Sequence, residues 1–347
     1  MTSERIKSLA SECGFELCGV APALPATEAR YYHEWVKAGF AGEMKYLTDR
    51  RAHARDDPRN LLPAARSIIC VGKVYDTPRP YSVEVHDPGR GWISRYAWGQ
   101  DYHDVLRAGL ERLVERIRAE RTEPFEWKIA MDTAPLLERA YAQRAGLGWI
   151  ARNTCLINEC LGSWIFLGEL LVSFDLAPDS APPERCGSCT RCIDACPTAA
   201  IVPTGAADGP AWALDSRRCI SYFTIELRSA VPEEHRAATG NHVFGCDICQ
   251  DVCPWNQRRP RSDEPAFEAQ HFAPPLEQLA ALSEEEFRAA FRSSPVRRAQ
   301  YSGFLRNVAV AMGNSRAGRY RGVLERLACC GDRLVEEHAR WALGRLE

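Results

Sequence analysis

The sequence of 347 residues has no long uninterrupted apolar run. Its most apolar stretch, residues 161–174, is interrupted by Glu169, whereas a membrane-spanning helix needs roughly 18 to 20 apolar residues. The first twenty residues carry Glu4, Glu12 and Glu16 and lack the apolar segment, about 7 to 15 residues long, of a secretory signal. We therefore expect neither a membrane protein nor an exported one, and we predict a cytoplasmic location.

Two nucleotide-binding motifs are also missing. No G-x-G-x-x-G sequence follows a predicted strand and no Walker A sequence occurs, so neither a nicotinamide site nor an ATP site is indicated. The formal net charge of −2 excludes a strongly basic field over the whole protein. The charge is uneven, however, because residues 295–347 contain ten arginines and only five acidic residues. A local nucleic-acid surface at this end therefore stays open.

The composition, with 46% hydrophobic and 26% charged residues, is that of a globular protein, and the length favours two or three domains. A Pro-rich segment at 177–185 and a second break at 257–265 divide the chain. After the second break, three short amphipathic helices are predicted at 299–313, 320–330 and 334–346, as in a helical hairpin repeat.

Helix and strand patterns alternate in the first 175 residues. Helices are predicted at 27–38 and at 101–119, the latter capped by Asp101, and buried strands at 67–74 and 127–131. The core face of the longer helix has Leu106, Leu110, Leu113, Val114 and Ile117 at helical spacing.

Asp132 directly follows the second predicted strand. The sequence Thr133-Ala134-Pro135 signals the start of a helix that ends near Gly146. Proteins of the α/β class often place chemistry at such a junction, although an ordinary helix cap is the simpler interpretation.

The fifteen cysteines give the strongest signal. Seven of them form two runs that each end in Cys-Pro, and an eighth, Cys219, lies between the runs. In two-cluster ferredoxins the cysteine before proline serves the other cluster. We therefore assign one [4Fe-4S] cluster to Cys186, Cys189, Cys192 and Cys253. The other cluster is assigned to Cys196, Cys219, Cys246 and Cys249.

Zinc is the alternative for these cysteines, but zinc sites rarely repeat the C-x2-C-x2-C-x3-C-P pattern. The seven other cysteines show no ligand spacing, and most are predicted to be packing residues. They are Cys13, Cys18, Cys70, Cys155, Cys160, Cys329 and Cys330. Two clusters only relay single electrons, so the N-terminal part must hold a further redox cofactor.

Four stretches of the sequence together resemble the epoxyqueuosine reductases. They are residues 57–69 (DPRNLLPAARSII), 95–106 (RYAWGQDYHDVL), 131–157 (starting MDTAPLLER) and 219–226 (CISYFTIE). The resemblance covers nearly the whole chain. It implies the last step of queuosine synthesis, in which epoxyqueuosine at the wobble position of tRNA is reduced to queuosine with release of water.

The resemblance also implies the fold and the cofactors. It predicts an α+β protein with an N-terminal α/β cobalamin-binding domain (1–176), a two-cluster ferredoxin-like domain (177–260) and a C-terminal HEAT-like helical repeat that binds tRNA (261–347). The reduction needs two electrons and two protons. Base-off cobalamin, as cob(I)alamin, would collect the electron pair from the clusters. An external low-potential donor of the flavodoxin or ferredoxin type would supply the electrons, and the chain would act as a monomer.

Asp132 matches the proton donor of that family. To donate a proton near neutral pH, its pKa must be raised by burial above the ordinary value of about 3.9. Further residues in the matching stretches are candidates for contacts with cobalamin or with the modified base, although each could be a structural polar residue. They are Asp101, Tyr102, His103, Arg139, Asn153, Thr154 and Ser221. Residue 152 is Arg where the family often has Lys, which leaves the role of that position open.

The predicted phosphate contacts are arginines near and within the basic C-terminal segment. They are Arg258, Arg259, Arg297, Arg298 and Arg306. Two other functions are considered. A corrinoid reductase of a small halogenated molecule would share the cofactors but would not need the arginine-rich tail. A simple electron-transfer protein would leave about 175 N-terminal residues without a role.

Overall fold

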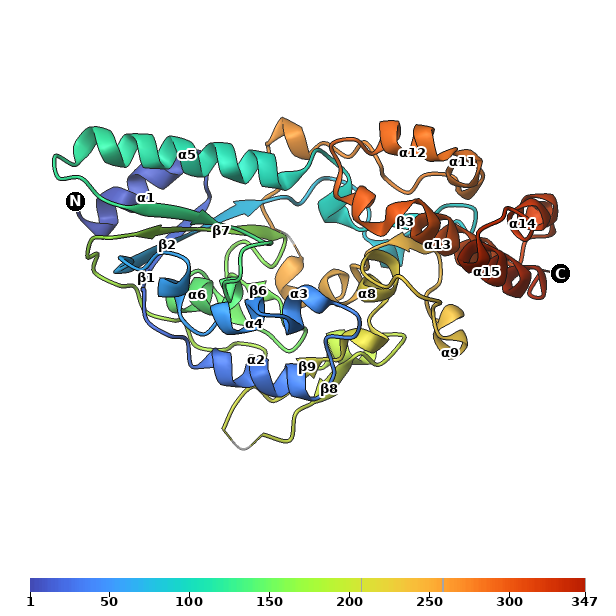
Figure 1. Cartoon of the computed structure of the whole chain (residues 1–347), viewed down its shortest axis with the longest axis horizontal. Coiled ribbons are helices and arrows are strands. Elements are labelled where there is room, and N and C mark those ends of the chain that lie inside the picture. The colour runs from blue at the N-terminus through green and yellow to red at the C-terminus, as the bar shows by residue number, and fades with distance from the viewer. Residues whose placement is uncertain (207, 258, 347) are drawn as a thin grey trace.

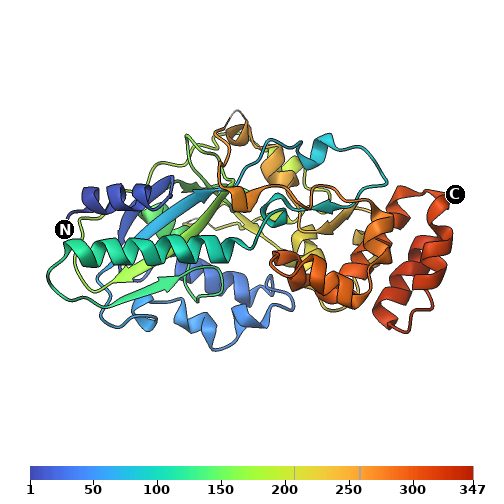
Figure 2. The same cartoon turned by 90° about the horizontal axis from the view of Figure 1, so that it is seen from above.

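The computed structural model describes residues 1–206, 208–257 and 259–346. The molecule is elongated, and the two ends of the chain lie at opposite ends of its long axis (Figures 1 and 2). None of the helices in the described part of the chain has the length and the apolar character that crossing a bilayer requires.

The N-terminal half is built around a four-stranded sheet in the order β1-β2-β7-β4. The strands are β1 (Leu17–Pro22), β2 (Ser67–Val74), β4 (Trp127–Ala130) and β7 (Ile165–Val172). All three pairings are antiparallel. The predicted strands at 67–74 and 127–131 are therefore confirmed, but the alternation of helices and strands does not produce the parallel sheet of an α/β domain.

Helices cover both faces of this sheet (Figure 1). On one face lie α1 (Ser3–Glu12) and α5 (Tyr102–Glu120), whose buried leucines and isoleucines pack on β2 and β7. The predicted helix at 101–119 and its Asp101 cap are confirmed, since the Asp101 side chain accepts a hydrogen bond from the His103 amide. On the other face lies α6 (Glu138–Arg144).

The connection between β1 and β2 contains the predicted helix at 27–38, observed as α2 (Glu28–Lys37), followed by the short helices α3 (Lys45–Thr48) and α4 (Arg51–Ala54). After α6, a hairpin of β5 (Trp149–Ile150) and β6 (Leu156–Ile157) leads into β7.

The cysteine-rich segment consists of short elements. They are α7 (Arg191–Asp194), β8 (Ile201–Pro203), β9 (Trp212–Leu214), α8 (Ile220–Ile225), α9 (Glu233–Arg236), β10 (His242–Phe244) and α10 (Ile248–Asp251). β8 and β9 pair with each other, whereas β10 pairs in parallel with β3 (Trp92–Ile93) from the N-terminal half.

The C-terminal end is helical. It contains α11 (Leu276–Ala281), α12 (Glu284–Ala290), α13 (Gln300–Ser315), α14 (Arg321–Leu327) and α15 (Arg333–Leu343). Three of these helices confirm the segments predicted at 299–313, 320–330 and 334–346. Their core also takes in residues 92–98, including Trp92 and Trp98, together with Val243 and Phe244 of β10. A segment from the N-terminal half is thus part of the C-terminal core.

Candidate active site and metal centres

Asp132 lies just after β4 in a left-handed backbone conformation, with φ of 41°. Few residues other than glycine adopt this conformation, because the Cβ atom then crowds the backbone. The amide of Asp132 donates a hydrogen bond to the carboxylate of Glu138, the first residue of α6. The helix therefore starts later than the predicted Thr133, because residues 131–137 form a loop that places Asp132 at the end of the sheet.

His103 links Asp132 to Asp101. Its Nδ1 atom lies 2.6 Å from Asp101 Oδ1, and its Nε2 atom lies 3.1 Å from Asp132 Oδ2. Burial disfavours the charged imidazolium, but the hydrogen bonds to the two carboxylates outweigh it and raise the pKa of His103 to about 9. The structure thus joins three of the predicted site residues into one carboxylate–imidazole–carboxylate array.

The same contacts correct one expectation. Burial tends to raise the pKa of Asp132, but the hydrogen bond from His103 and the charge of Arg298 prevail and lower it below its ordinary value. The expectation of a raised pKa is therefore wrong for this arrangement. In the array as it stands, His103 carries the proton and Asp132 is a carboxylate.

Arg298 approaches this array from the C-terminal part of the chain. Its guanidinium lies 3.5 Å from Asp132 Oδ2 and 2.7 Å from Glu226 Oε1, and it donates a hydrogen bond of 3.1 Å to the hydroxyl of Tyr46. Arg298 was predicted as a tRNA contact, but the structure places it against the candidate proton donor. Glu226 and Tyr46 were not predicted. Glu226 ends one of the four stretches that carry the resemblance, whereas only the fold brings Tyr46 here.

Two further carboxyl groups, those of Glu169 and Glu138, lie near Asp132. Glu169, in the middle of β7, is fully buried and stands opposite Ala130 of β4, and neither of its side-chain oxygens has a hydrogen-bond partner among the described residues. Burial, and then the nearby charge of Glu138, raise the pKa of Glu169 well above its ordinary value. The pKa of Glu138 is also raised, by burial and by the charge of Asp132. Burial and this neighbouring charge therefore favour the neutral acid form of Glu169 inside the sheet.

The other candidate cofactor contacts fall into separate groups. The ring of Tyr102 stacks on His103 and on Phe166, each with 4.1 Å between ring centroids. Arg139 donates to the backbone carbonyl of Thr154, which has a left-handed φ of 62°. Ser221 lies on α8, close in the chain to Glu226.

Asn153 connects the loop between β5 and β6 to the cysteines. Its side chain is buried and donates a hydrogen bond of 3.3 Å to the carbonyl of Cys249. The neighbouring Arg152 donates to the carbonyls of Gly187 and Cys189. Arginine at this position therefore fastens the first cysteine loop to the N-terminal half.

The eight predicted cluster ligands form two groups in space. Cys186, Cys189, Cys192 and Cys253 all line one small cavity, beside Trp255 and residues 151–153. In the second group, burial raises the pKa of Cys219 and of Cys246, and the nearby charge of Cys196 raises both further, so these three thiols lie near one another. The pKa of Cys249 is raised by burial and then by the charges of Cys155, Cys246 and Cys219, so Cys155 also lies near this group. A set of four thiols suits an iron–sulfur cluster, since thiolates are its usual ligands.

Comparison with known proteins decides the family. The family model described as "Epoxyqueuosine reductase QueG, DUF1730" matches residues 55–133, and the model "4Fe-4S double cluster binding domain" matches residues 185–256. The epoxyqueuosine reductase of Xanthomonas campestris is 40% identical over 347 residues, which cover 98% of this chain and 95% of the relative. This chain belongs to the epoxyqueuosine reductase family.

Solved structures agree with this assignment. The crystal structure of an epoxyqueuosine reductase with an epoxyqueuosine-modified tRNA-Tyr stem loop is 29% identical, with a TM-score of 0.87, and covers 99% of this chain and 89% of its own. An epoxyqueuosine reductase from Bacillus subtilis, solved with its catalytic aspartate loop swung out of the active site, is also 29% identical, with a TM-score of 0.85 and the same coverage.

The arginines predicted to bind tRNA have different surroundings. Arg297 is exposed, whereas Arg259 donates to the carbonyls of Glu159 and Cys160, and Arg258 lies outside the described residues. The prediction for Arg306 is wrong. Its side chain is buried in α13 and donates to the carbonyls of Phe223, Leu227 and Ser229, so it cannot reach a phosphate at the surface.

The seven remaining cysteines divide by exposure. Cys13 and Cys70 are buried in the cores around the sheet and so fit the packing prediction, and Cys18 and Cys155 are half-buried. Cys160, Cys329 and Cys330 are exposed, so packing does not explain them.

Proposed function

We propose that this chain reduces epoxyqueuosine to queuosine at the wobble position of tRNA. The observation that carries the proposal is the array of Asp101, His103 and Asp132, closed by Arg298, in a chain that matches a tRNA-bound epoxyqueuosine reductase over nearly its whole length. Removal of the epoxide oxygen as water consumes two protons, and the array holds an imidazolium against a carboxylate where a proton can be exchanged.

In this proposal Asp132 delivers the proton to the epoxide oxygen and His103 restores it. The hydrogen bond between His103 Nε2 and Asp132 Oδ2 provides the path, because a proton moves along it without crossing solvent. Asp101 holds His103 through Nδ1 and so fixes the ring orientation. Arg298 keeps Asp132 ionised until substrate binding breaks the ion pair between Arg298 and Asp132. The catalytic aspartate loop of the Bacillus subtilis relative supports a mobile position for such an acid.

The two groups of four thiols fit two [4Fe-4S] clusters, with the ligand sets that the spacing predicts. The loop that carries Cys186 and Cys189 is at the surface, with Gly187 and Ser188 exposed. We expect an external low-potential donor of the flavodoxin or ferredoxin type to deliver electrons there. Cys249 of the second group is joined through Asn153 to the loop with Thr154, so electrons would leave on the side of the candidate active site.

Base-off cobalamin is the cofactor that would accept them. When bound, it stores two electrons at cobalt and supplies the reducing equivalents for the epoxide. Two residues that suit it are Arg139 and Thr154, which offer a guanidinium and a hydroxyl for its amide side chains. We assign this role to residues 1–176, the clusters to residues 177–260, and the tRNA surface to the HEAT-like helices within residues 261–347.

The exposed Arg297 lies next to Arg298 in the chain, so a phosphate contact there would place the anticodon close to Asp132. Since one chain carries the acid array, both thiol groups and this arginine, we propose that it works as a monomer.

The decisive experiment is mass spectrometry of nucleosides from bulk tRNA of cells that lack this gene, with and without its restoration. We expect epoxyqueuosine to accumulate without the gene and to be converted to queuosine when the gene is restored. Equal queuosine levels in both strains would overturn the tRNA substrate. Restoration with the Asp104→Asn variant serves as a matched control, since Asp104 is an exposed acid in the first turn of α5.

A further inference from the structure

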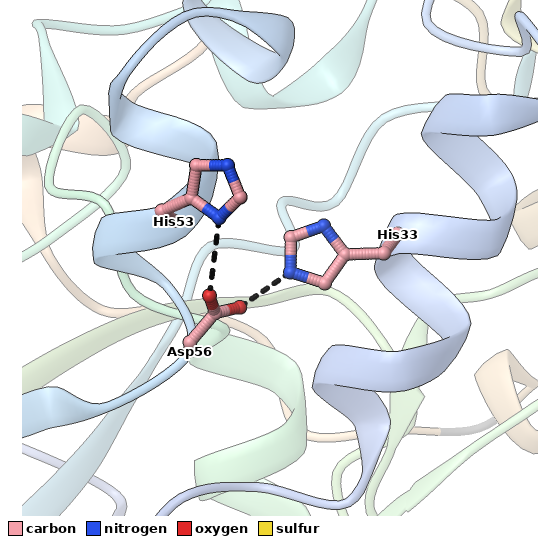
Figure 3. Close-up of side chains that lie close together, drawn as sticks. All are labelled: His33, His53 and Asp56. Atoms are coloured by element: carbon pink, nitrogen blue, oxygen red, sulfur yellow. Dashed lines mark hydrogen bonds and ion pairs between the residues drawn. The ribbon is translucent and has the colours of Figure 1, made fainter.

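Three side chains of types that can bind metals meet at the surface of the N-terminal half. They are His33 of α2, His53 of α4 and Asp56, just after α4. One ligand atom from each lies within 4.8 Å of the other two. Figure 3 shows the two imidazole rings on facing helices, both turned toward the carboxylate between them.

The contacts in this group are specific. His33 Nε2 lies 2.5 Å from Asp56 Oδ1, and His53 Nδ1 lies 3.4 Å from Asp56 Oδ2. The two rings are 5.5 Å apart between centroids and inclined by 33°, so their nitrogen atoms converge without the rings stacking. His53 and Asp56 are three residues apart, which places both on the same side of the chain.

From this geometry we propose that His33, His53 and Asp56 form a binding site for a divalent transition-metal cation, with zinc as the representative ion. Two imidazoles and a carboxylate are ligands that suit zinc, and three protein ligands leave one tetrahedral position for water. Magnesium and calcium prefer all-oxygen ligand sets, so they are poor competitors here.

Access and charge are favourable for a cation. The side chains of His33, Asp56 and His53 are 37%, 40% and 83% exposed, so an ion can reach them from solvent and replace the hydrogen bond between His33 and Asp56. The adjacent cation, Arg55, is buried, and its guanidinium donates to the carbonyl of Arg51 and lies over the ring of Tyr32. Its donors are thus directed to other groups.

The site would also close a loop of the chain. His33 and Asp56 bracket the segment with Tyr46, whose hydroxyl receives the hydrogen bond from Arg298 beside Asp132. A metal ion joining α2 to the end of α4 would hold this segment in place. The inferred role is therefore structural, and it does not depend on the proposed reaction.

The test uses the enzyme with both iron–sulfur clusters already assembled, so that the cluster cysteines are occupied. The protein is dialysed against buffered micromolar zinc, and bound zinc is measured by elemental analysis and by X-ray absorption at the zinc edge. We expect one zinc per chain with only nitrogen and oxygen neighbours, at about 2.0 to 2.2 Å. Sulfur neighbours at about 2.3 Å would mean that cysteines hold the metal, and would overturn the proposal.

Variants test whether the zinc is bound by these three residues. His53→Gln should weaken zinc binding at least tenfold while the fold is kept, because His53 is largely exposed; Asp56→Asn gives a second, nearly isosteric test. His86→Gln is the matched control, since His86 is an exposed histidine on another segment, and it should bind zinc like the parent protein. Equal zinc affinity in His53→Gln and in the parent, or no zinc retained by the parent, would refute the site.

Discussion

One imidazole, that of His103, lies between the carboxylates of Asp101 and Asp132 and so connects the first turn of α5 to the end of β4. This bond pattern determines which group carries the proton: the histidine is the strong base, and Asp132 is kept ionised. A reaction that needs a proton from Asp132 must therefore change the surroundings of Asp132 when the substrate binds. Arg298, which reaches Asp132 at 3.5 Å, is the contact that such a change would release.

The Asp132→Asn variant tests the acid directly. We expect turnover to fall by at least a hundredfold, because the amide cannot supply the proton, whereas iron and cobalt contents stay at the parent level. Single-turnover reduction with purified tRNA measures the rate, and elemental analysis measures the cofactors. Full activity in this variant would exclude Asp132 as the proton donor.

The activity should depend on the charge of His103. Since the pKa of His103 is raised to about 9, the imidazolium persists through neutral pH and is lost as the pH rises through about 9. The rate should fall on this alkaline side in the parent enzyme. The His103→Gln variant should turn over slowly at every pH, and its rate should not fall on the alkaline side. A pH profile of His103→Gln parallel to that of the parent would contradict the proposal that His103 returns a proton to Asp132.

His103 also contributes to stability in a pH-dependent way. Its folded pKa lies above the unfolded value of about 6.5, so its contribution is complete below that pH and is lost as the pH rises toward about 9. The carboxylates of Asp101 and Asp132 act in the opposite direction. Because their folded pKa values are lowered, their contribution is present above pH about 3.9 and is lost in stronger acid.

Glu169 should make the free energy of unfolding fall as the pH rises, whereas a carboxylate with a lowered pKa makes it rise. Its folded pKa is raised, so ionisation favours the unfolded chain once the pH exceeds the unfolded value of about 4.3. Glu169→Gln removes this effect. Between pH 5 and 7, the parent should lose up to about 1.4 kcal/mol of unfolding free energy per pH unit relative to Glu169→Gln. Denaturant titrations at both values measure this difference, and equal pH slopes would show that Glu169 is ionised in the folded protein.

Two arginines of the C-terminal segment should respond differently to substitution. Arg306→Met leaves buried carbonyls of Phe223, Leu227 and Ser229 without a donor and should destabilise the fold by about 2 to 5 kcal/mol. Arg297→Gln, at an exposed position, should keep the melting temperature of the parent but weaken tRNA binding. The slope of the logarithm of tRNA affinity against the logarithm of salt concentration should become shallower by about one, as expected for the loss of one phosphate contact. Thermal unfolding measures the loss of stability, and tRNA binding at several salt concentrations measures the loss of a phosphate contact. A stable Arg306→Met protein with weakened tRNA binding would show that Arg306 contacts tRNA after all.

The proposed ligand sets predict how much bound iron is lost when one cysteine is replaced. Cys189→Ala removes one thiol of the cavity that it shares with Cys186, Cys192 and Cys253, so about half of the bound iron, or all of it, should be lost. Cys329→Ala, at an exposed cysteine outside both groups, is the control and should keep all of it. Unchanged iron in Cys189→Ala would reject the ligand scheme.

The sequence predicted those features whose signal is local. The strand at 67–74 and the helix with its Asp101 cap depend on apolar spacing and on one side chain, and both are confirmed. The start of α6 at Glu138 could not be predicted, because the left-handed Asp132 is held by the folded sheet and by the carboxylate of Glu138.

Long-range packing determined the rest. Arg298 and Arg306 look alike in the sequence, but one lies against Asp132 and the other is enclosed by backbone carbonyls of the cysteine-rich segment. Charge counts cannot separate them. Tyr46 and Glu226 reach the site from two further segments that meet only in the folded chain.

The parallel pairing of β3 with β10 sets an order for folding. Residues 92–93 emerge early in synthesis, but their partner strand at 242–244 and the helices that cover Trp92 and Trp98 come much later. The four strands of the N-terminal sheet all lie within residues 17–172, so this sheet can form earlier. The second core must wait until nearly the whole chain has left the ribosome. Because contacts between distant segments form slowly, we expect this core to be the last part of the fold to form.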